Sequence, residues 1–135
     1  MMKKILLLTH GEFSKGIKTS LDVIISDSSM VDAMSVGVSD SPAEIKERIQ
    51  QYIDQVDEEV PIFILTDIPA GSTTANAAQY VPYRNNIYLI TGMNLGMLLA
   101  FALESVEEGD VRENVLSIIE DAKNTMVYVN DMFGQ

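Results

Sequence analysis

The sequence predicts an α/β protein with a mainly parallel central sheet and helices on both faces of that sheet. Short apolar runs alternate with longer segments of helical periodicity along the chain. The runs 4–9, 60–66 and 86–91 are mostly apolar, as is typical of strands that are buried on both faces. Neither a repeat nor a linker interrupts this alternation, so the 135 residues are predicted to form a single domain, 1–135.

The first half of the chain predicts two strand–helix units. The strand over 4–9 precedes a helix over 14–26, and the strand over 31–38 precedes a helix that begins at Ser41. Ser41 and Glu44 form a capping box, and Pro42 suits the first helical position between them. The inner faces of the two helices are predicted from the apolar spacing to be Ile17, Leu21, Ile24 and Ile25 in one, and Ile45, Ile49, Tyr52, Ile53 and Val56 in the other.

The second half continues the alternation. The strand over 60–66 is followed by a turn over 67–71 and by a helix that Ser72 begins or caps. The strand over 86–91 ends at Gly92, a short apolar helix follows over 94–104, and a last helix opens at 109–110. The segment 126–129 alternates weakly, which is compatible with either a helix end or a fifth strand.

Composition excludes several classes of function. The formal net charge of −11 should repel nucleic acids and anionic membrane surfaces and attract a basic protein partner. The chain has no cysteine, which excludes disulfides and cysteine-based metal sites. The apolar run near the N-terminus is too short for a signal peptide, and no stretch approaches the ~20 apolar residues of a membrane span. We therefore expect a cytoplasmic protein.

His10 is the only histidine of the chain and the strongest candidate for chemistry. It ends the first strand, and the following Gly11 leaves room for a bulky group beside the ring. Ligands of parallel sheets gather beyond the carboxyl ends of the strands, where loops 9–11, 67–72 and 92–94 are predicted to converge. An imidazole there can act as a nucleophile and hold a phosphoryl group. The alternative is that a lone histidine in a loop has no catalytic role.

Two further features suit a nucleophilic histidine. Asp67 ends the third strand, so it is predicted to orient His10 if the first and third strands are neighbours. Gly71, Ser72 and Thr73 open a helix whose N–H groups and hydroxyls suit an anion. The alternatives are that Asp67 initiates a turn and that Ser72 caps a helix. The sequence contains no metal-ligand cluster and no dinucleotide or P-loop fingerprint, so neither a metal nor a cofactor is predicted.

Three motifs together resemble a known family. They are an apolar strand that ends in Thr9-His10-Gly11, the run from Thr66-Asp67 through Gly71-Ser72 to Asn76-Ala77-Ala78, and the segment Gly92-Met93-Asn94-Leu95-Gly96-Met97-Leu98. In this order they are similar to the IIA domains of the mannose–fructose–sorbose class of the bacterial phosphoenolpyruvate:sugar phosphotransferase system. Pro69-Ala70 and Thr73-Thr74 depart from the family's usual residues, which leaves the phosphate donors and the sugar class open.

The resemblance implies a flavodoxin-like fold and a homodimer that exchanges an antiparallel strand near the C-terminus. It implies that His10 accepts phosphate from the phosphocarrier HPr and passes it to a IIB subunit, which serves a IIC/IID membrane permease. It further implies that Asp67 orients His10 and that Gly71, Ser72 and Thr73 bind the phosphoryl group. The chain would then be a phosphotransferase with a phosphohistidine intermediate.

Other classes remain as alternatives. The phosphotransfer subunit of a dihydroxyacetone kinase has a similar fold and histidine, although the segment 92–98 favours the sugar system. A non-catalytic regulatory domain of the same fold would have lost His10 or Asp67, and both are present. A histidine phosphatase is disfavoured, because Thr9 stands where its arginine should be and there is no second histidine.

Overall fold

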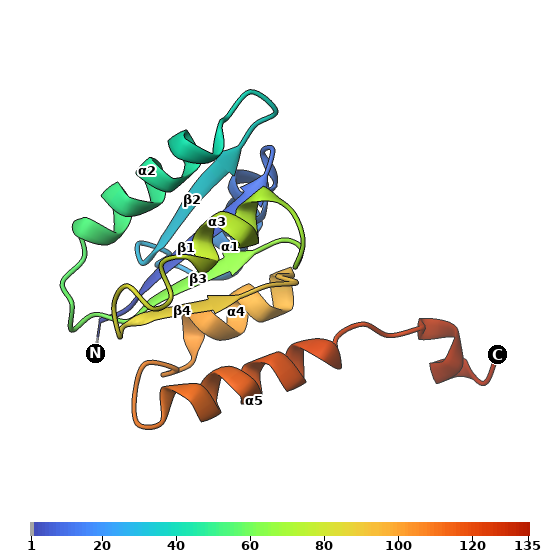
Figure 1. Cartoon of the computed structure of the whole chain (residues 1–135). Helices are drawn as coiled ribbons and strands as arrows, with labels where there is room; N and C mark the ends of the chain where they lie inside the picture. Colours follow the sequence, from blue (N-terminus) through green and yellow to red (C-terminus); the bar gives the residue numbers. More distant parts are fainter. Residues whose placement is uncertain (1) are drawn as a thin grey trace.

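Parallel strands form a single sheet at the centre of the molecule. In the computed structural model, which describes residues 2–135, the strands of this sheet are β1 (Lys4–His10), β2 (Val31–Val36), β3 (Ile62–Thr66) and β4 (Ile87–Ile90). Their spatial order is β2-β1-β3-β4, and all neighbouring pairs run parallel (Figure 1). The α/β fold class predicted from the sequence is thus confirmed.

The two central strands are buried on both faces. Side chains alternate along a strand, so Ile5 and Leu7 of β1 enter one core while Leu6 and Leu8 enter the other. The same division holds in β3, where Phe63 and Ile64 lie in opposite cores. This two-sided burial explains why both strands read as unbroken apolar runs.

Helices cover both faces of the sheet (Figure 1). On one side, α1 (Phe13–Ile24) and α4 (Leu95–Leu103) share a core with the sheet, and α5 (Val111–Lys123) packs on α4. On the other side lie α2 (Pro42–Asp54) and α3 (Ser72–Ala78). The loops that follow the strands, rather than the helices on the two faces, form the carboxyl edge of the sheet.

Local signals set most helix boundaries. The Ser41 hydroxyl accepts the Glu44 N–H at 3.1 Å, as the capping box predicts, and the Asp110 carboxylate accepts the Glu113 N–H at 3.1 Å. One inner-face prediction is wrong: Ile24 is 52% exposed. Ile24 is the last residue of α1 and the following Ile25 is extended, so Ile24 belongs to a final helical turn that is exposed.

The C-terminal segment differs from both expectations within the single chain. Helix α5 ends at Lys123, so 126–129 does not continue it, and no strand forms there. Instead a 3₁₀ helix, η1 (Val129–Phe133), follows a short irregular stretch. Figure 1 shows this segment leading away from the sheet, where it has no strand edge of its own chain to join.

Candidate functional site

The order of the strands brings two of the predicted site residues together. β1 and β3 are direct neighbours, with Leu8 opposite Thr66, so the residues that follow lie side by side at the carboxyl edge. These residues include His10, which ends β1, and Asp67, which follows β3. The sequence predicts that the two side chains meet if the first and third strands are neighbours. The structure shows both the adjacency and the contact.

Hydrogen bonds to α1 and β2 hold the backbone of the loop that carries His10. Thr9 is fully buried, and its hydroxyl accepts the N–H of Ser14 in the first turn of α1 at 2.7 Å. The N–H of Gly11 donates to the Val36 carbonyl of β2 at 2.8 Å, with Gly11 in the left-handed region at φ 57°. These bonds hold the backbone on both sides of His10, while its side chain remains 42% exposed.

Asp67 binds His10 at two points through one oxygen. Its Oδ2 atom lies 2.8 Å from the backbone nitrogen of His10 and 2.8 Å from the ring Nδ1 atom. The Asp67 side chain is only 12% exposed, so water competes poorly for these bonds. When Nδ1 carries the proton it donates to Asp67, and the other ring nitrogen, Nε2, then has a free lone pair.

The second carboxylate oxygen of Asp67 is also occupied. Oδ1 accepts the Ile68 N–H at 3.1 Å and the Thr73 hydroxyl at 3.0 Å. Burial raises the pKa of Asp67, but the hydrogen bonds from His10 and Thr73 outweigh burial and lower the pKa below its ordinary value of 3.8. Asp67 is therefore held as a carboxylate at neutral pH.

Gly71 lies against the free side of the His10 ring. A Cβ atom placed on Gly71 would be 3.1 Å from both Nε2 and Cε1 of His10, so only a glycine leaves the ring this space. Gly71 also has φ 102°, which side chains rarely tolerate. It immediately precedes α3, and Nε2 of His10 thus faces the loop that opens this helix.

The three predicted phosphate-binding residues divide into two groups. Gly71 lies beside Nε2 and is exposed, and Ser72 follows it, half-buried, at the start of α3. Thr73, by contrast, is fully buried, and its hydroxyl donates to Asp67. The α3 turn directs this hydroxyl at the carboxylate, and the binding of phosphate by Thr73 stays a prediction.

The third converging loop supports the edge without adding a side chain to the ring. The N–H of Met93 donates to the Thr66 carbonyl at 3.0 Å, which ties this loop to the end of β3. The Asn94 side chain accepts the Met97 N–H at 2.8 Å and so caps α4. The segment 92–94 therefore reaches the predicted edge, with its polar side chain used for capping.

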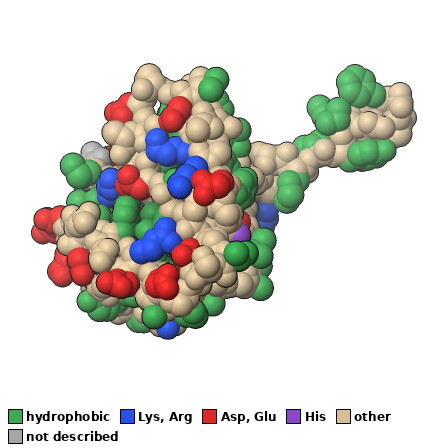
Figure 2. Space-filling view, turned by 90° about the horizontal axis from the view of Figure 1, so that it is seen from above, with side chains coloured by type: hydrophobic (Ala, Val, Ile, Leu, Met, Phe, Trp, Pro, Cys, Tyr) green, Lys and Arg blue, Asp and Glu red, His purple; other side chains and the backbone are tan. Residues whose placement is uncertain are grey.

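Sequence reasoning missed the exposed apolar side chains at this edge. Phe13, Val38 and Ile68 follow β1, β2 and β3, and each is at least 46% exposed. Charges beside them are paired, Glu12 with Lys15 and Asp40 with Arg48. Figure 2 shows a face of the molecule on which acidic and basic groups are interspersed. The surface near His10 is thus apolar with balanced charge, although the chain as a whole is acidic.

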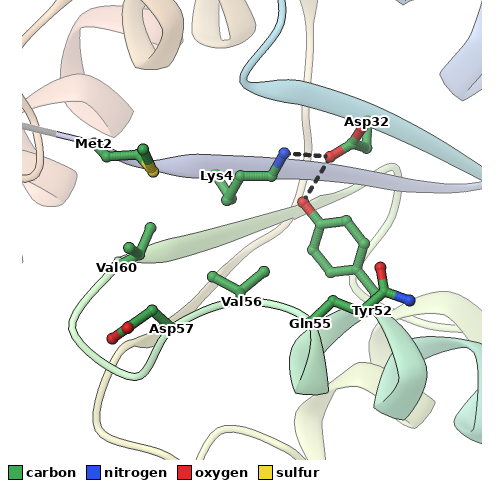
Figure 3. Close-up of a pocket in the computed structure, with 8 residues that line it drawn as sticks. All are labelled: Met2, Lys4, Asp32, Tyr52, Gln55, Val56, Asp57 and Val60. Carbon is green, nitrogen blue, oxygen red and sulfur yellow. Dashed lines mark hydrogen bonds and ion pairs between the residues drawn. The ribbon is translucent and has the colours of Figure 1, made fainter.

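A hollow of about 570 Å³ lies at the opposite end of the sheet (Figure 3). Asp32 accepts from the Lys4 ammonium and the Tyr52 hydroxyl, both at 2.9 Å. Burial, followed by the Asp32 charge, raises the pKa of Tyr52 and keeps it protonated. Lys4 begins β1 whereas His10 ends it, so this hollow is separate from the His10 site.

Two features are absent from residues 2–135. No group of three or more histidine, aspartate or glutamate side chains is arranged to bind a metal ion. No helix in that range combines the length and the apolar character needed to span a bilayer.

Comparisons with known proteins bear on the family and the fold of the chain. The family described as "PTS system fructose IIA component" matches residues 4–124. Among solved structures, the chain is similar to the phosphotransferase system component EIIA of Streptococcus agalactiae, with a TM-score of 0.86, 23% identity, and 96% of this chain and 99% of that chain covered.

A second similar structure is the mannose/sorbose specific IIA subunit of Enterococcus faecalis (TM-score 0.84, 19% identity, 94% of each chain covered). A third is the IIA protein associated with the fucose utilization operon of Streptococcus pneumoniae (TM-score 0.84, 18% identity, 98% of this chain and 97% of that chain covered). These identities support the fold, and the family match extends over most of the sequence. The chain belongs to the IIA component family of the sugar phosphotransferase system.

Proposed function

We propose that the chain is a cytoplasmic phosphoryl carrier that accepts phosphate from phospho-HPr on Nε2 of His10 and passes it to a IIB subunit. The observation that carries this proposal is the His10 ring, bound at Nδ1 by Asp67 and open at Nε2 beside Gly71. Membership of the IIA family supports the same role. Through IIB the phosphate would reach sugar during uptake by the IIC/IID permease.

The geometry suits in-line transfer between two histidines. The Nε2 lone pair attacks the phosphorus of phospho-HPr, a new P–N bond forms, and the HPr imidazole leaves with the electron pair of the broken bond. No proton needs to move, because His10 keeps its proton on Nδ1 and its ring becomes positively charged. The Asp67 carboxylate at 2.8 Å stabilises this charge. The reverse process transfers the group to IIB.

The phosphoryl oxygens would lie at the Gly71–Ser72 turn. Gly71 leaves space beside Nε2, and the first N–H groups of α3 have no partner in the preceding turn of the helix. The Ser72 side chain follows immediately and is half-buried. The closeness of Gly71 to Nε2 supports binding of the phosphate by the backbone N–H groups of this turn and by the Ser72 side chain.

Incubation with phosphoenolpyruvate, enzyme I and HPr tests the carrier role. The wild-type chain should acquire an acid-labile, base-stable label, and His10→Ala should acquire none. A folded wild-type sample that remains unlabelled would refute the proposal. The labelled chain should then lose phosphate to a mannose-class IIB domain. Transfer instead to the nucleotide of a dihydroxyacetone kinase subunit would favour the alternative function.

We further propose a homodimer formed through the C-terminal segment. Six apolar side chains of this segment are more than half exposed in the single chain: Met126, Val127, Tyr128, Val129, Met132 and Phe133. Such a set needs a covering surface. Strand β4 is an edge of the sheet, so a partner's segment has a strand to join.

Light scattering should give twice the chain mass, and truncation after Lys123 should give a monomer. A monomeric full chain would exclude the dimer.

A further inference from the structure

We propose that Thr73 is a positioning residue that sets the tautomer and orientation of His10 by holding Asp67, and that it does not bind the phosphoryl group through its hydroxyl. This inference rests on the carrier function proposed above, to which it adds one residue. It follows from the contacts of two adjacent threonines in the first turn of α3.

The Thr73 hydroxyl has one partner, and that partner is the oxygen of Asp67 that His10 does not use. Its Oγ1 atom lies 3.0 Å from Oδ1, and Thr73 is 0% exposed. Oδ2 accepts both bonds from His10. Because the carboxylate is planar and rigid, a bond that fixes Oδ1 also fixes Oδ2. Thr73 therefore acts on the imidazole through a single intervening side chain, the Asp67 carboxylate.

The other partner of Oδ1 cannot replace Thr73. This partner is the N–H of Ile68, which belongs to the residue next to Asp67 and therefore moves with the same loop. Thr73 lies on a different element, so it alone anchors Oδ1 to α3. Asp67 is only 12% exposed, so water has little access to compensate for a lost hydroxyl.

Thr74 shows that the start of α3 is itself anchored. Its hydroxyl donates to the Ile68 carbonyl at 2.6 Å and lies 2.8 Å from the Thr66 hydroxyl. Adjacent helical residues point about 100° apart, so the two threonines reach different parts of the 66–68 segment. Thr74 therefore fixes the backbone of this segment, and Thr73 fixes the carboxylate of Asp67.

The consequence concerns which nitrogen of His10 is available. A fixed Oδ2 favours the tautomer with the proton on Nδ1 and leaves Nε2 as the nucleophile. Without the Thr73 hydroxyl the carboxylate can rotate, which weakens its bond to the ring and admits the other tautomer. The expected effect is a smaller nucleophilic fraction and a slower transfer, without a change in what contacts phosphate.

The test compares Thr73→Val, which keeps the shape and removes the hydroxyl, with Thr73→Ser, which keeps the hydroxyl. Nitrogen-15 chemical shifts of the His10 ring in the unphosphorylated chain report the tautomer. We expect Thr73→Val to increase the Nε2-protonated fraction and to slow transfer from phospho-HPr roughly tenfold, on the scale of a lost hydrogen bond to a charged group. Thr73→Ser should restore both to within about twofold of wild type.

Ring shifts and rates that are unchanged in a folded Thr73→Val would overturn the inference. So would an effect of equal size in Thr73→Ser, since keeping the hydroxyl would then make no difference. If Thr73→Val does not fold, the wild-type hydroxyl proton decides: protection from exchange supports the bond to Asp67, and free exchange contradicts it. All ring measurements use unphosphorylated protein, so they stay interpretable even if the chain proves not to accept phosphate.

Discussion

The Oδ2 atom of Asp67 accepts two hydrogen bonds from His10, one from its backbone N–H and one from its ring, each at 2.8 Å. The backbone bond fixes where the carboxylate stands relative to β1, and the ring bond fixes the imidazole relative to the carboxylate. The two strands therefore orient the ring jointly, with little dependence on the exposed surface around it.

Asp67→Asn should slow phosphoryl transfer while the fold remains intact. An amide has a single acceptor oxygen, is uncharged, and places N–H donors where an acceptor is needed. A lost charge-assisted bond is worth about 1.5–3 kcal/mol, so the rate should fall at least about tenfold. Quench-flow labelling from phospho-HPr measures the rate, and His10→Ala serves as the control that should acquire no label. Transfer at the wild-type rate would remove Asp67 from the mechanism.

Asp67 should also make stability depend on acid pH. Its pKa is lowered in the folded chain from an ordinary value of 3.8. The stability it provides is therefore complete above the unfolded-state pKa and is lost as pH falls through the folded-state pKa. Urea unfolding from neutral pH downward should show a steeper acid loss in wild type than in Asp67→Asn. Parallel curves for the two proteins would contradict the assigned bonds.

Gly71→Ala should block phosphorylation out of proportion to its effect on stability. The new methyl would lie 3.1 Å from Nε2 and Cε1 of His10. Gly92→Ala is the matched control, because Gly92 also has a positive φ, 80°, but a Cβ atom added there would have no neighbour within 4 Å. Both should lose about 1–3 kcal/mol of stability through backbone strain. Only Gly71→Ala should lose labelling; equal labelling of the two would show that the ring tolerates a neighbour there.

The sequence was sufficient to predict the His10–Asp67 pair, because continuous apolar runs define buried parallel strands and such strands end at one edge. It was insufficient for Thr73, since Ser, Thr and Gly at a helix start suit both an anion and a cap. Which way each hydroxyl points depends on the rotation of α3 against β3, and tertiary packing fixes that rotation. The prediction for Ile24 failed because the apolar spacing extends into the last turn of α1, and that turn is exposed.

The C-terminal segment was unpredictable for a different reason. Its weak alternation suits a strand, but a strand needs an edge to pair with, and the segment leads away from its own sheet (Figure 1). The neighbouring residues in the sequence do not indicate which strand edge such a segment would pair with. The apolar edge near His10 was also missed, since Phe13, Val38 and Ile68 are far apart in sequence and only the topology collects them.

Phe13→Ser should weaken the encounter with phospho-HPr. Phe13 is 46% exposed in the first turn of α1, at the same edge as His10, and aromatic side chains commonly anchor protein interfaces. Val23→Ser is the control, because Val23 is 87% exposed near the far end of the same helix. Transfer rates are measured as a function of phospho-HPr concentration. The concentration that gives half the maximal rate should rise severalfold in Phe13→Ser alone, which corresponds to a loss of binding free energy on the order of 1 kcal/mol. An equal shift in both variants would point to altered stability of α1.

A buried ion pair holds the start of the chain to the loop between α4 and α5. Lys3 donates to the Glu107 carboxylate at 3.4 Å and to the Glu104 carbonyl at 2.6 Å, and both charged side chains are less than 10% exposed. Lys3→Met leaves Glu107 buried without its partner, which should cost about 3–5 kcal/mol of the free energy of unfolding.

The double variant Lys3→Met with Glu107→Met removes both charges and should recover most of that loss, since no buried charge is left uncompensated. Urea unfolding of the two variants measures the difference. Equal stability of the single and the double variant would mean that water reaches Glu107 and that the pair is not buried in solution. His10 labelling should persist in both variants, because the pair lies at the opposite end of β1 from the site.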